Sequence, residues 1–473
     1  MKPLVEELEW MLPHEVFANF ADEPFALFLD SATAAPGRDA GLHGRWSFIA
    51  VAPFETICLR IGEGAGAPFD LVKQKLMELP VVERDETMPP FCGGAAGFFG
   101  YGLGRTLERL PPEEAPHATD DQGFPDMALG FYDVVMAFDM IAKRAVAISS
   151  GLPEHDPGKR ATRAKARMAE VVARLKASTP AEQKAARSST AIASNFTRDA
   201  YERAVTRVIE YIHAGDIFQA NLSQRFETRL ADGDTPIALY LRLRATSPAP
   251  FASFFNFGSG AIVSSSPERF LSCRNGIVET KPIKGTRPRG ATPEEDARLA
   301  ADLLASEKDR AENVMIVDLL RNDISRVCND NSVEVEKLCE LESFANVHHL
   351  VSTVRGRLRP GMTSADLLAA CFPGGSVTGA PKRRAMEIIA ELEPTTRGPY
   401  CGAIGWLGAD GSMDSAITIR TIVVDGRRVT FQAGGGIVAD SDPAAEYEET
   451  LAKALNMLEA LDGAPALLAG EPA

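Results

Sequence analysis

A run of glycines among apolar residues, at positions 91–104, is the feature that most constrains how this chain can fold. The six glycines are Gly93, Gly94, Gly97, Gly100, Gly102 and Gly104. Because glycine has no Cβ atom, such a run predicts that neighbouring backbone packs closely against it. No strand–turn–helix dinucleotide fingerprint surrounds the run, so a phosphate-binding loop is not expected there.

The first 150 residues, which contain this run, are rich in predicted strands. Residues 45–52 form one candidate, and residues 127–138 form a second that leads into a third at 145–148. All three combine apolar, β-branched and aromatic residues, which favour strands. Residues 1–150 are therefore predicted to be a strand-rich N-terminal region.

The composition of the chain changes after this region. Residues 159–175, rich in Ala, Arg and Lys, predict a helix. The Ala, Ser, Thr, Gln and Lys residues of 176–194 predict a flexible connector, so 151–195 is expected to link two larger parts. Thr197 can cap the next helix, and beyond it predicted strands and helices alternate irregularly.

The overall composition excludes several classes of function. The 473 residues, 45% of them hydrophobic, are typical of a globular protein with a large core. A net charge of −15 disfavours general binding to nucleic acid or to an anionic membrane, so an anionic small substrate would need a positive pocket or a metal ion. The seven cysteines form no CxxC pair, the N-terminus has no signal-peptide pattern, and no apolar run reaches membrane-spanning length. We therefore expect a cytoplasmic protein.

Lys284 lies near the end of a predicted strand, where a positive charge is hard to explain structurally. The strand at 276–280 follows an Asn-Gly hairpin signal, and Gly285 lets another group approach the backbone closely. An amine in this setting can be desolvated, lose its proton more easily and act as a nucleophile or a base. The alternative is a solvated lysine beside Arg287 and Arg289 in a basic loop.

Two predicted helices carry acidic residues three positions apart. The pairs are Asp309 with Glu312, and Glu446 with Glu449, which is followed by Lys453. Ser306 can cap the first helix, and the Ser-Asp-Pro sequence at 441–443 is a strong start for the second. Brought together, the two pairs would make an oxygen-rich site suited to Mg²⁺. Each pair alone is more typical of a solvated helix surface.

Two glycine-rich segments could bind anions. The segment 373–382, which contains Ser376, precedes a predicted helix, and its amides and hydroxyls suit a carboxylate or phosphate. It is not a nucleotide-binding P-loop, because Ala380 and Pro381 stand where that motif requires Lys and Ser or Thr. Gly434, Gly435 and Gly436 follow a predicted strand at 428–432, and they either expose backbone N–H groups to a ligand or form a bulge or tight bend.

Three single residues complete the candidates. Arg420 lies in the alternating segment 416–424, which predicts a strand, and needs either a substrate carboxylate or a structural ion pair. His349 can donate a proton or stabilise charge, or it can be a satisfied core histidine. Glu268 can act as a general acid, or it can form a salt bridge with Arg269.

Several long motifs in a fixed order give the chain a close resemblance to the chorismate-utilising enzymes. The segments that carry it are 264–270, 281–290, 307–323, 349–350, 374–382, 400–405, 419–421 and 433–453. The resemblance implies an α+β fold, in which large antiparallel β-sheets pack as a sandwich with helices on the outer faces. It covers roughly residues 195–460, so we expect the chorismate-binding catalytic region at 196–462 and a C-terminal tail at 463–473. Residues 1–150 resemble, less specifically, the N-terminal region of the amidotransferase-linked members.

The resemblance also implies roles for the candidate residues. Lys284 would be a covalent nucleophile, Glu268 the general acid, and His349 a stabiliser of developing charge. The carboxylates of chorismate would be bound by Ser376, Tyr400, Arg420, Gly434, Gly435, Gly436 and Lys453. A Mg²⁺ ion would be held by Glu312 and Glu449 directly, and by Asp309 and Glu446 through water.

Within the family, two positions indicate which reaction is carried out. Members that aminate chorismate at C4 usually carry Lys at position 284, whereas those that aminate C2 usually carry Ala. Gln219 stands where the water-adding members place a lysine base, which argues against isochorismate or salicylate synthesis. The chain therefore most resembles the C4-aminating branch, which serves p-aminobenzoate and folate formation.

The resemblance also implies a partner. No glutaminase Cys-His-Glu arrangement is evident in the sequence, so a separate glutamine amidotransferase subunit is expected to supply the ammonia. Two alternatives stay open: a C2-aminating enzyme of tryptophan biosynthesis with the same fold and metal, and a non-catalytic binding protein that keeps the fold. The full carboxylate set and Lys284 speak against the second alternative.

Overall fold

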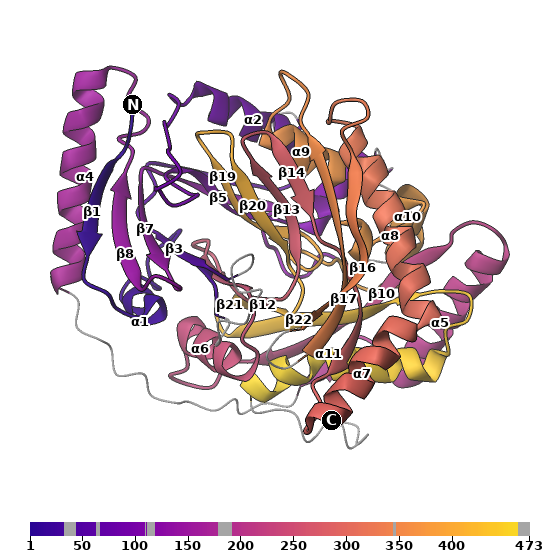
Figure 1. The fold of residues 1–473 in the computed structure, drawn as a ribbon. Coiled ribbons are helices and arrows are strands. Elements are labelled where there is room, and N and C mark those ends of the chain that lie inside the picture. The colour runs from indigo at the N-terminus through magenta and orange to yellow at the C-terminus, as the bar shows by residue number, and fades with distance from the viewer. Residues whose placement is uncertain are drawn as a thin grey trace.

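In a computed structural model, the chain forms two large antiparallel sheets with helices around them (Figure 1). The structure describes residues 1–32, 44–62, 67–108, 110, 119–177, 192–343 and 347–461. Most of the connector predicted at 176–194, and the tail predicted at 463–473, lie outside these residues.

The larger sheet joins strands from both ends of the chain. Its spatial order is β1 (Leu4–Leu8), β8 (Arg144–Ser149), β7 (Val134–Asp139), β3 (Trp46–Ala50), β2 (Leu27–Asp30), β11 (Phe251–Asn256), β12 (Ala261–Ser266), β21 (Thr421–Asp425), β22 (Arg428–Ile437), β10 (Gln219–Arg229) and β18 (Gly379–Ala380), with β9 (Ala193–Ser194) paired to β10. The pairing of β2 with β11 connects the N-terminal strands directly to the rest of the sheet.

The second sheet is also shared between the two parts of the chain. Its spatial order is β15 (Ile283–Pro288), β17 (Val347–Arg357), β14 (Ile277–Thr280), β13 (Arg269–Arg274), β20 (Met413–Ile417), β19 (Ala403–Gly408), β5 (Gly94–Phe99), β6 (Met127–Tyr132) and β4 (Glu55–Leu59), with β16 (Glu334–Ser343) paired to β17. In this sheet, the pairing of β5 with β19 connects the N-terminal strands to the strands of the C-terminal part.

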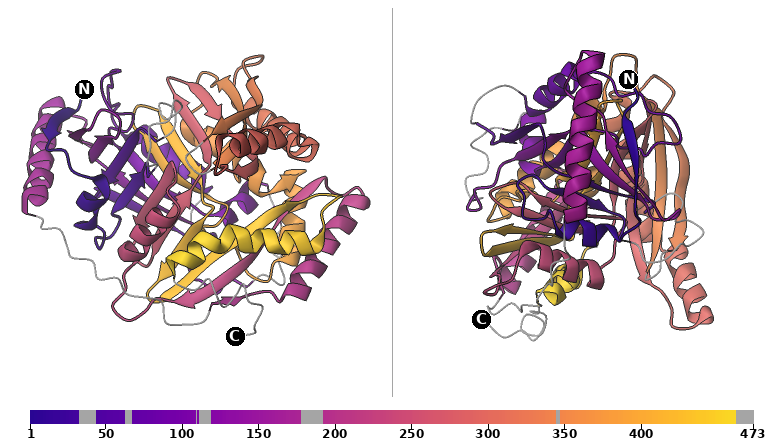
Figure 2. Two further views of the ribbon diagram at one scale, coloured as in Figure 1. Left: turned by 60° about the horizontal axis from the view of Figure 1, so that its bottom comes forward. Right: turned by 90° about the vertical axis from the view of Figure 1, so that its left-hand side faces the viewer.

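The helices cover the outer faces of the two sheets (Figures 1 and 2). They are α1 (Pro13–Ala18), α2 (Pro68–Glu78), α3 (Gly104–Leu107), α4 (Pro157–Ala177), α5 (Arg198–His213), α6 (Pro236–Thr246), α7 (Pro293–Ala305), α8 (Glu307–Ser325), α9 (Ser364–Cys371), α10 (Lys382–Leu392) and α11 (Pro443–Ala460), with 3₁₀ turns at Tyr101–Leu103 and Gly375–Val377. Over the described ranges, none of these helices is both long and apolar enough to cross a membrane.

Three apolar layers hold the sheets and helices together. Between the sheets, Phe48 and Phe255 of the larger sheet pack with Phe98 and Trp406 of the second. A second layer lies between the larger sheet and helices that include α6 and α11, and a third between the second sheet and helices that include α2 and α9. Burial of these layers is the main favourable contribution to folding. The predicted α+β sandwich with outer helices is confirmed.

The glycine run of the N-terminal region packs as its composition predicts. Gly94 and Gly97 have φ values of 137° and 151° in β5. A Cβ atom on Gly94 would lie 2.3 Å from the carbonyl oxygen of Leu407, and one on Gly97 would lie 2.2 Å from that of Ala128. Larger residues would therefore force β5 away from its neighbours β19 and β6.

Two segments predicted to be single strands each divide between the sheets. Residues 127–138 form β6 in the second sheet and β7 in the larger one, and the chain changes sheet at Asp133. Residues 416–424 form the end of β20 and most of β21, and Arg420 lies in the crossing rather than inside a strand. The predictions were wrong because an apolar pattern continues through a crossing when both sheets are buried.

Candidate active site

A cavity of about 1070 Å³ lies beside the glycines of β22, between segments of α8, α11 and β15. Most residues predicted for the site line it. They are Glu268, Lys284, Asp309, Glu312, His349, Ser376, Tyr400, Arg420, Gly434, Gly436, Glu446, Glu449 and Lys453. Gly435 is on the opposite face of β22, toward the carboxylates of α11. The cavity is large enough for a small organic substrate.

Glu268 is one of the two buried acids that line the cavity. It follows β12 and is buried, and Ser376 Oγ donates a hydrogen bond of 2.9 Å to its Oε1. Burial raises the pKa of Glu268 to about 7, although Ser376 and the nearby Lys284 oppose this shift. The salt bridge with Arg269 is not formed, because Arg269 pairs with Asp414 and Glu279. Glu268 can therefore donate or accept a proton near neutral pH.

Lys284 lies in β15 with its amine in the cavity. Desolvation lowers the pKa of its amine, while the carboxylates of Glu312 and Glu268 act in the opposite direction. A lowered pKa increases the fraction of neutral amine, which is the nucleophilic form. The strand end predicted for this residue is close to what is observed, since Lys284 is the second residue of β15.

The two predicted acidic helices bring their carboxylates to one side of the cavity. Ser306 caps α8 through a hydrogen bond from Asp309 N, and Asp442 caps α11 with Pro443 in the first turn, as predicted. Burial raises the pKa of Glu312, and it also raises that of Glu446 despite the hydrogen bond from Ser441.

The charge of the Glu449 carboxylate is balanced by Lys453, a lysine of the same helix. Burial alone would raise the pKa of Glu449, but Lys453 Nζ lies 2.6 Å from Glu449 Oε1 and lowers it. Lys453 also donates to the carbonyl oxygen of Gly434 at 2.8 Å. This lysine therefore connects the carboxylates of α11 to the glycines of β22.

The donor chemistry of this side fits a hard divalent cation. A Cβ atom on Gly435 would lie 2.9 Å from Glu446 Oε2 and 3.4 Å from Glu449 Oε1, so the glycine leaves room for both carboxylates above β22. Glu312 lines the same cavity from α8. Oxygen donors of this kind suit Mg²⁺. Within the described ranges, no three His, Cys, Asp or Glu side chains already form a finished metal site.

Asp309, the second residue of α8 predicted for the metal site, contacts the segment that follows Lys284. Its Oδ2 accepts a hydrogen bond of 3.2 Å from Arg287. Gly285 has a φ of 79°, and a Cβ atom there would lie 2.9 Å from Asp309 Cβ. The close approach predicted at Gly285 is thus made by α8, and it fixes Lys284 against the acidic helix.

His349 and Arg420 lie on other parts of the wall. Burial lowers the pKa of His349 to about 4, so its ring is neutral near pH 7, and its Nδ1 lies 2.9 Å from Thr286 Oγ1. Burial also lowers the pKa of Arg420, which has a left-handed φ of 51°. No carboxylate of the described chain forms an ion pair with Arg420, so its guanidinium is free to bind an anion.

The glycines of β22 and the turn that contains Ser376 form the part of the cavity lining that could bind an anion. β22 continues without a break through Gly434–Gly436, paired in regular register with β10, so the bulge or bend considered from the sequence is absent from this strand. Ser376 lies in a 3₁₀ turn, and α10 begins after Pro381 as predicted.

Several residues that line the cavity were not predicted from the sequence, and three polar ones among them are Lys308, Thr286 and Asn221. Lys308 lies in the first turn of α8, Thr286 contacts His349, and Asn221 lies on β10 opposite Gly436. The alternation of side chains along a strand could have indicated Asn221, because it shares a face with Gln219. Lys308 and Thr286 have no comparable sequence signal.

The sandwich and the motifs that it brings to this cavity define an enzyme of the chorismate-utilising class. A family model described as "chorismate binding enzyme" matches residues 35–459. The chain belongs to this family.

Relatives with two different names are similar over most of the chain. Aminodeoxychorismate synthase component 1 of Klebsiella aerogenes is 42% identical over 475 residues, which cover 98% of this chain and 100% of the relative. Anthranilate synthase component 1 of Thermus thermophilus is 44% identical over 388 residues, covering 81% of each chain. The crystal structure of anthranilate synthase component I from Streptococcus pneumoniae has a TM-score of 0.78 and 36% identity, covering 90% of this chain and 93% of that one.

Proposed function

We propose that this chain is component I of an aminodeoxychorismate synthase. It would use ammonia to replace the C4 hydroxyl of chorismate and form 4-amino-4-deoxychorismate, for p-aminobenzoate and folate biosynthesis in the cytoplasm. The observation that carries the proposal is Lys284, a desolvated amine that lines the same cavity as the buried acid Glu268. The 42% identity to the Klebsiella aerogenes aminodeoxychorismate synthase component 1 supports it.

The chorismate dianion would be bound by the cationic side chains and backbone amides that line the cavity. Arg420, whose guanidinium has no carboxylate partner in the described chain, takes one carboxylate, with Tyr400 beside it. The amides of Gly434 to Gly436, Ser376 and Lys453 assist. These contacts offset the repulsion that a protein of net charge −15 exerts on a dianion.

Mg²⁺ would be held by Glu312 and Glu449, with Asp309 and Glu446 through water, and would neutralise a substrate carboxylate. Among these residues, Glu312 and Glu446 have raised pKa values from burial, and a cation would relieve the cost of ionising them.

The chemical step divides one displacement into two. The neutral amine of Lys284 attacks C2, the C1=C2 and C5=C6 double bonds shift to C1=C6 and C4=C5, and the C4–O bond breaks as Glu268 donates a proton so that water leaves. Glu268 then takes the proton released by the Lys284 nitrogen. Ammonia next attacks C4, both double bonds shift back to C5=C6 and C1=C2, and the C2–N bond breaks. Glu268 returns its proton to Lys284 and receives one from the new C4 nitrogen.

His349 completes the wall on the side of Lys284. Because its pKa of about 4 keeps the ring neutral, it can polarise the reacting system without adding a second full charge beside the lysine. A separate glutamine amidotransferase subunit is the proposed source of ammonia, and the component 1 name of the similar proteins supports a partner.

C2 amination is the second candidate function. The 44% identity to anthranilate synthase component 1 of Thermus thermophilus favours it. That reaction gives Lys284 no covalent role. Lys284 in the cavity, with its lowered pKa, is therefore the observation that favours C4.

The test is the identity of the product. The protein is incubated with chorismate, Mg²⁺ and ammonium chloride, an aminodeoxychorismate lyase is added, and the aromatic product is identified by chromatography. The proposal predicts p-aminobenzoate. Anthranilate would establish C2 amination instead, and no turnover at any ammonium concentration would favour a binding protein that has kept the fold.

A further inference from the structure

Lys382, the first residue of α10, carries a buried positive charge. Its side chain is only 6% exposed, and its Nζ lies 2.7 Å from Oδ2 of Asp323 in α8, which is 4% exposed. Burial raises the pKa of Asp323, and the charge of Lys382 opposes this shift. A lysine is unfavourable at a helix N-terminus, and taking two charges out of water is costly even when they are paired. We therefore expect this pair to do more than hold the fold.

The ammonium group of Lys382 also closes the loop that carries Ser376. It donates a second hydrogen bond, of 2.9 Å, to the carbonyl oxygen of Cys371, the last residue of α9. Cys371 and Lys382 lie on either side of residues 372–381, so one buried cation joins both ends of this loop. We call Asp323 and Lys382 the clasp, because together they fix the spacing of the two loop ends and attach them to α8.

The middle of the loop packs on the same helix. A Cβ atom on Gly375 would lie 2.5 Å from Leu319 Cδ2, so the turn that contains Ser376 lies directly on α8, about one helical turn before Asp323. From this turn, Ser376 Oγ donates its hydrogen bond of 2.9 Å to Glu268 Oε1. A shift of the loop along α8 would therefore change the distance between the hydroxyl and the acid of the cavity.

We propose that the clasp positions Ser376 for its hydrogen bond to Glu268, so that Asp323 and Lys382 are positioning residues for the reaction. The inference rests on the proposed function, in which Ser376 binds a substrate carboxylate and Glu268 transfers protons. Hydrogen bonds fix both a distance and a direction, whereas apolar contacts tolerate small displacements. An apolar pair in place of the clasp would keep the fold but would let the loop shift.

The test replaces the clasp by apolar residues in the double variant Asp323→Leu/Lys382→Met. Removing one partner alone would leave a buried charge, whereas replacing both often preserves stability. If melting curves show that the double variant does not fold, Lys382→Arg takes its place, because it keeps the charge but moves the donors. Ser376→Ala is the reference, since it removes the hydrogen bond itself. The pH dependence of amination is measured for each variant and for their combination, at saturating chorismate and Mg²⁺ and constant free ammonia.

The matched control is Asp234→Leu/Arg242→Met. Arg242 pairs with Asp234 at 2.6 Å and donates to the carbonyl oxygen of Ala460, the last residue of α11, at 2.8 Å. Like Lys382, it joins an acid to the C-terminal carbonyl of a helix, but on α6 and α11 instead of the loop 372–381. Its replacement therefore tests the loss of such a pair without loss of the clasp.

The clasp predicts a specific change in the pH profile. Burial raises the pKa of Glu268 to about 7, and the hydrogen bond from Ser376 opposes this shift, as do the charges of Lys284 on β15 and Lys453 on α11. Without the hydrogen bond the acid stays protonated to higher pH. The decline of activity should then move upward, on the order of one pH unit, in both the clasp variant and Ser376→Ala. Their combination should show no further shift, because both remove the same interaction, and the control should keep the wild-type midpoint.

The possible failures are distinguishable. A wild-type midpoint in the clasp variant or in Ser376→Ala would overturn the inference, and the pair would then only stabilise the fold. If the wild-type protein forms anthranilate, the proposed function fails, but the same pH shifts in that reaction still decide on the clasp. If it forms no product, calorimetry of chorismate binding decides. The clasp predicts binding about tenfold weaker in both variants and no weaker in their combination, and unchanged binding would overturn it.

Discussion

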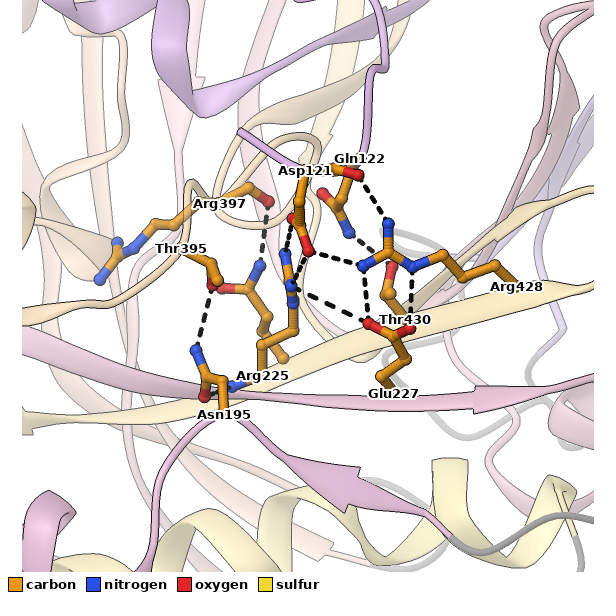
Figure 3. A network of polar contacts seen from close by, with 10 residues as sticks. Asp121, Gln122, Asn195, Arg225, Glu227, Thr395, Arg397, Arg428 and Thr430 are labelled. Carbon is orange, nitrogen blue, oxygen red and sulfur yellow. Dashed lines mark hydrogen bonds and ion pairs between the residues drawn. The ribbon is translucent and has the colours of Figure 1, made fainter. Parts of the chain in front are cut away.

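Two regions of this protein that contain buried and half-buried charges stabilise them in opposite ways. In one, the segment at 119–123 is joined to β10 and β22 by a network of ion pairs (Figure 3). In the other, the candidate active site, several charged side chains face a cavity. Comparing the pKa shifts of the two regions separates charges that hold the fold from charges that are available to a substrate.

In the network, every cation has a partner. Arg225 donates to both carboxylate oxygens of Asp121 at 2.8 and 2.7 Å, and Arg428 also binds this carboxylate. The hydrogen bond from Arg225 lowers the pKa of Asp121 to about 2. Burial alone would lower the pKa of Arg397, but the adjacent Glu393 raises it. Pairing therefore reinforces the charged forms.

In the cavity, Glu449 is paired with Lys453, but desolvation moves several other groups toward their neutral forms. It raises the pKa of Glu268 to about 7, and it lowers those of Lys284 and Arg420. Unpaired charge is costly, so its persistence at one place indicates that a ligand completes the site.

The largest expected effect is on turnover in Lys284→Ala. We expect the rate of C4 amination to fall about a thousandfold, because the covalent step is lost, with little change in KM for chorismate. The matched control is Lys281→Ala, three residues earlier, where the amine is paired with Glu342 at 2.8 Å. That variant should lose stability but keep most of its turnover. Equal rates for Lys284→Ala and the wild type would remove the covalent step.

The next effect is on stability, in Arg397→Met. Arg397 is buried and pairs with Glu393, and its guanidinium stacks near the rings of Tyr101 and Tyr400 at 4.6 and 5.7 Å. Removing it leaves a buried carboxylate unpaired, so the free energy of unfolding should fall by about 3–5 kcal/mol in urea titrations. Arg383→Met, which breaks an exposed pair with Glu387, should cost less than about 1 kcal/mol. Similar losses in both variants would refute the distinction.

Glu268→Gln tests the acid of the cavity. We expect the turnover number to fall about a hundredfold, because the amide cannot protonate the leaving hydroxyl. With a pKa of about 7, Glu268 is protonated below that pH, so wild-type activity should decline as the pH rises through 7. The variant should lack this decline in its pH–rate profile. A wild-type profile that is flat through neutral pH would assign the proton to another group.

The smallest effect is expected at the edge of the network, in Asp121→Asn. Asp121 is partly exposed, so solvent screening limits the expected loss to about 1 kcal/mol at pH 7. Its folded pKa of about 2 lies below the usual value of 3.8, so its stabilisation is present above pH 3.8 and is lost as the pH falls through 2. Urea unfolding of wild type and variant should therefore converge in strong acid, and a difference that persists below pH 2 would contradict this assignment.

The local signals in the sequence predicted the parts of the site that depend on neighbouring residues. The caps of α8 and α11 and the start of α10 follow from short-range hydrogen bonding and proline geometry, and all were predicted correctly. Sheet membership depends on distant partners. For this reason the sequence did not predict that the chain crosses between the sheets at Asp133 and Arg420, because the residues around both positions stay apolar throughout.

The most direct test of the central claim is to look for the chorismate adduct on Lys284. The wild-type protein is mixed with chorismate and Mg²⁺ without ammonium, quenched in acid and digested, and its peptides are measured by mass spectrometry. The account predicts that the peptide containing Lys284 gains the mass of chorismate less one water, and that Lys284→Ala gains nothing. An unmodified Lys284 peptide from an enzyme that forms p-aminobenzoate at its normal rate when ammonium is added would contradict the account.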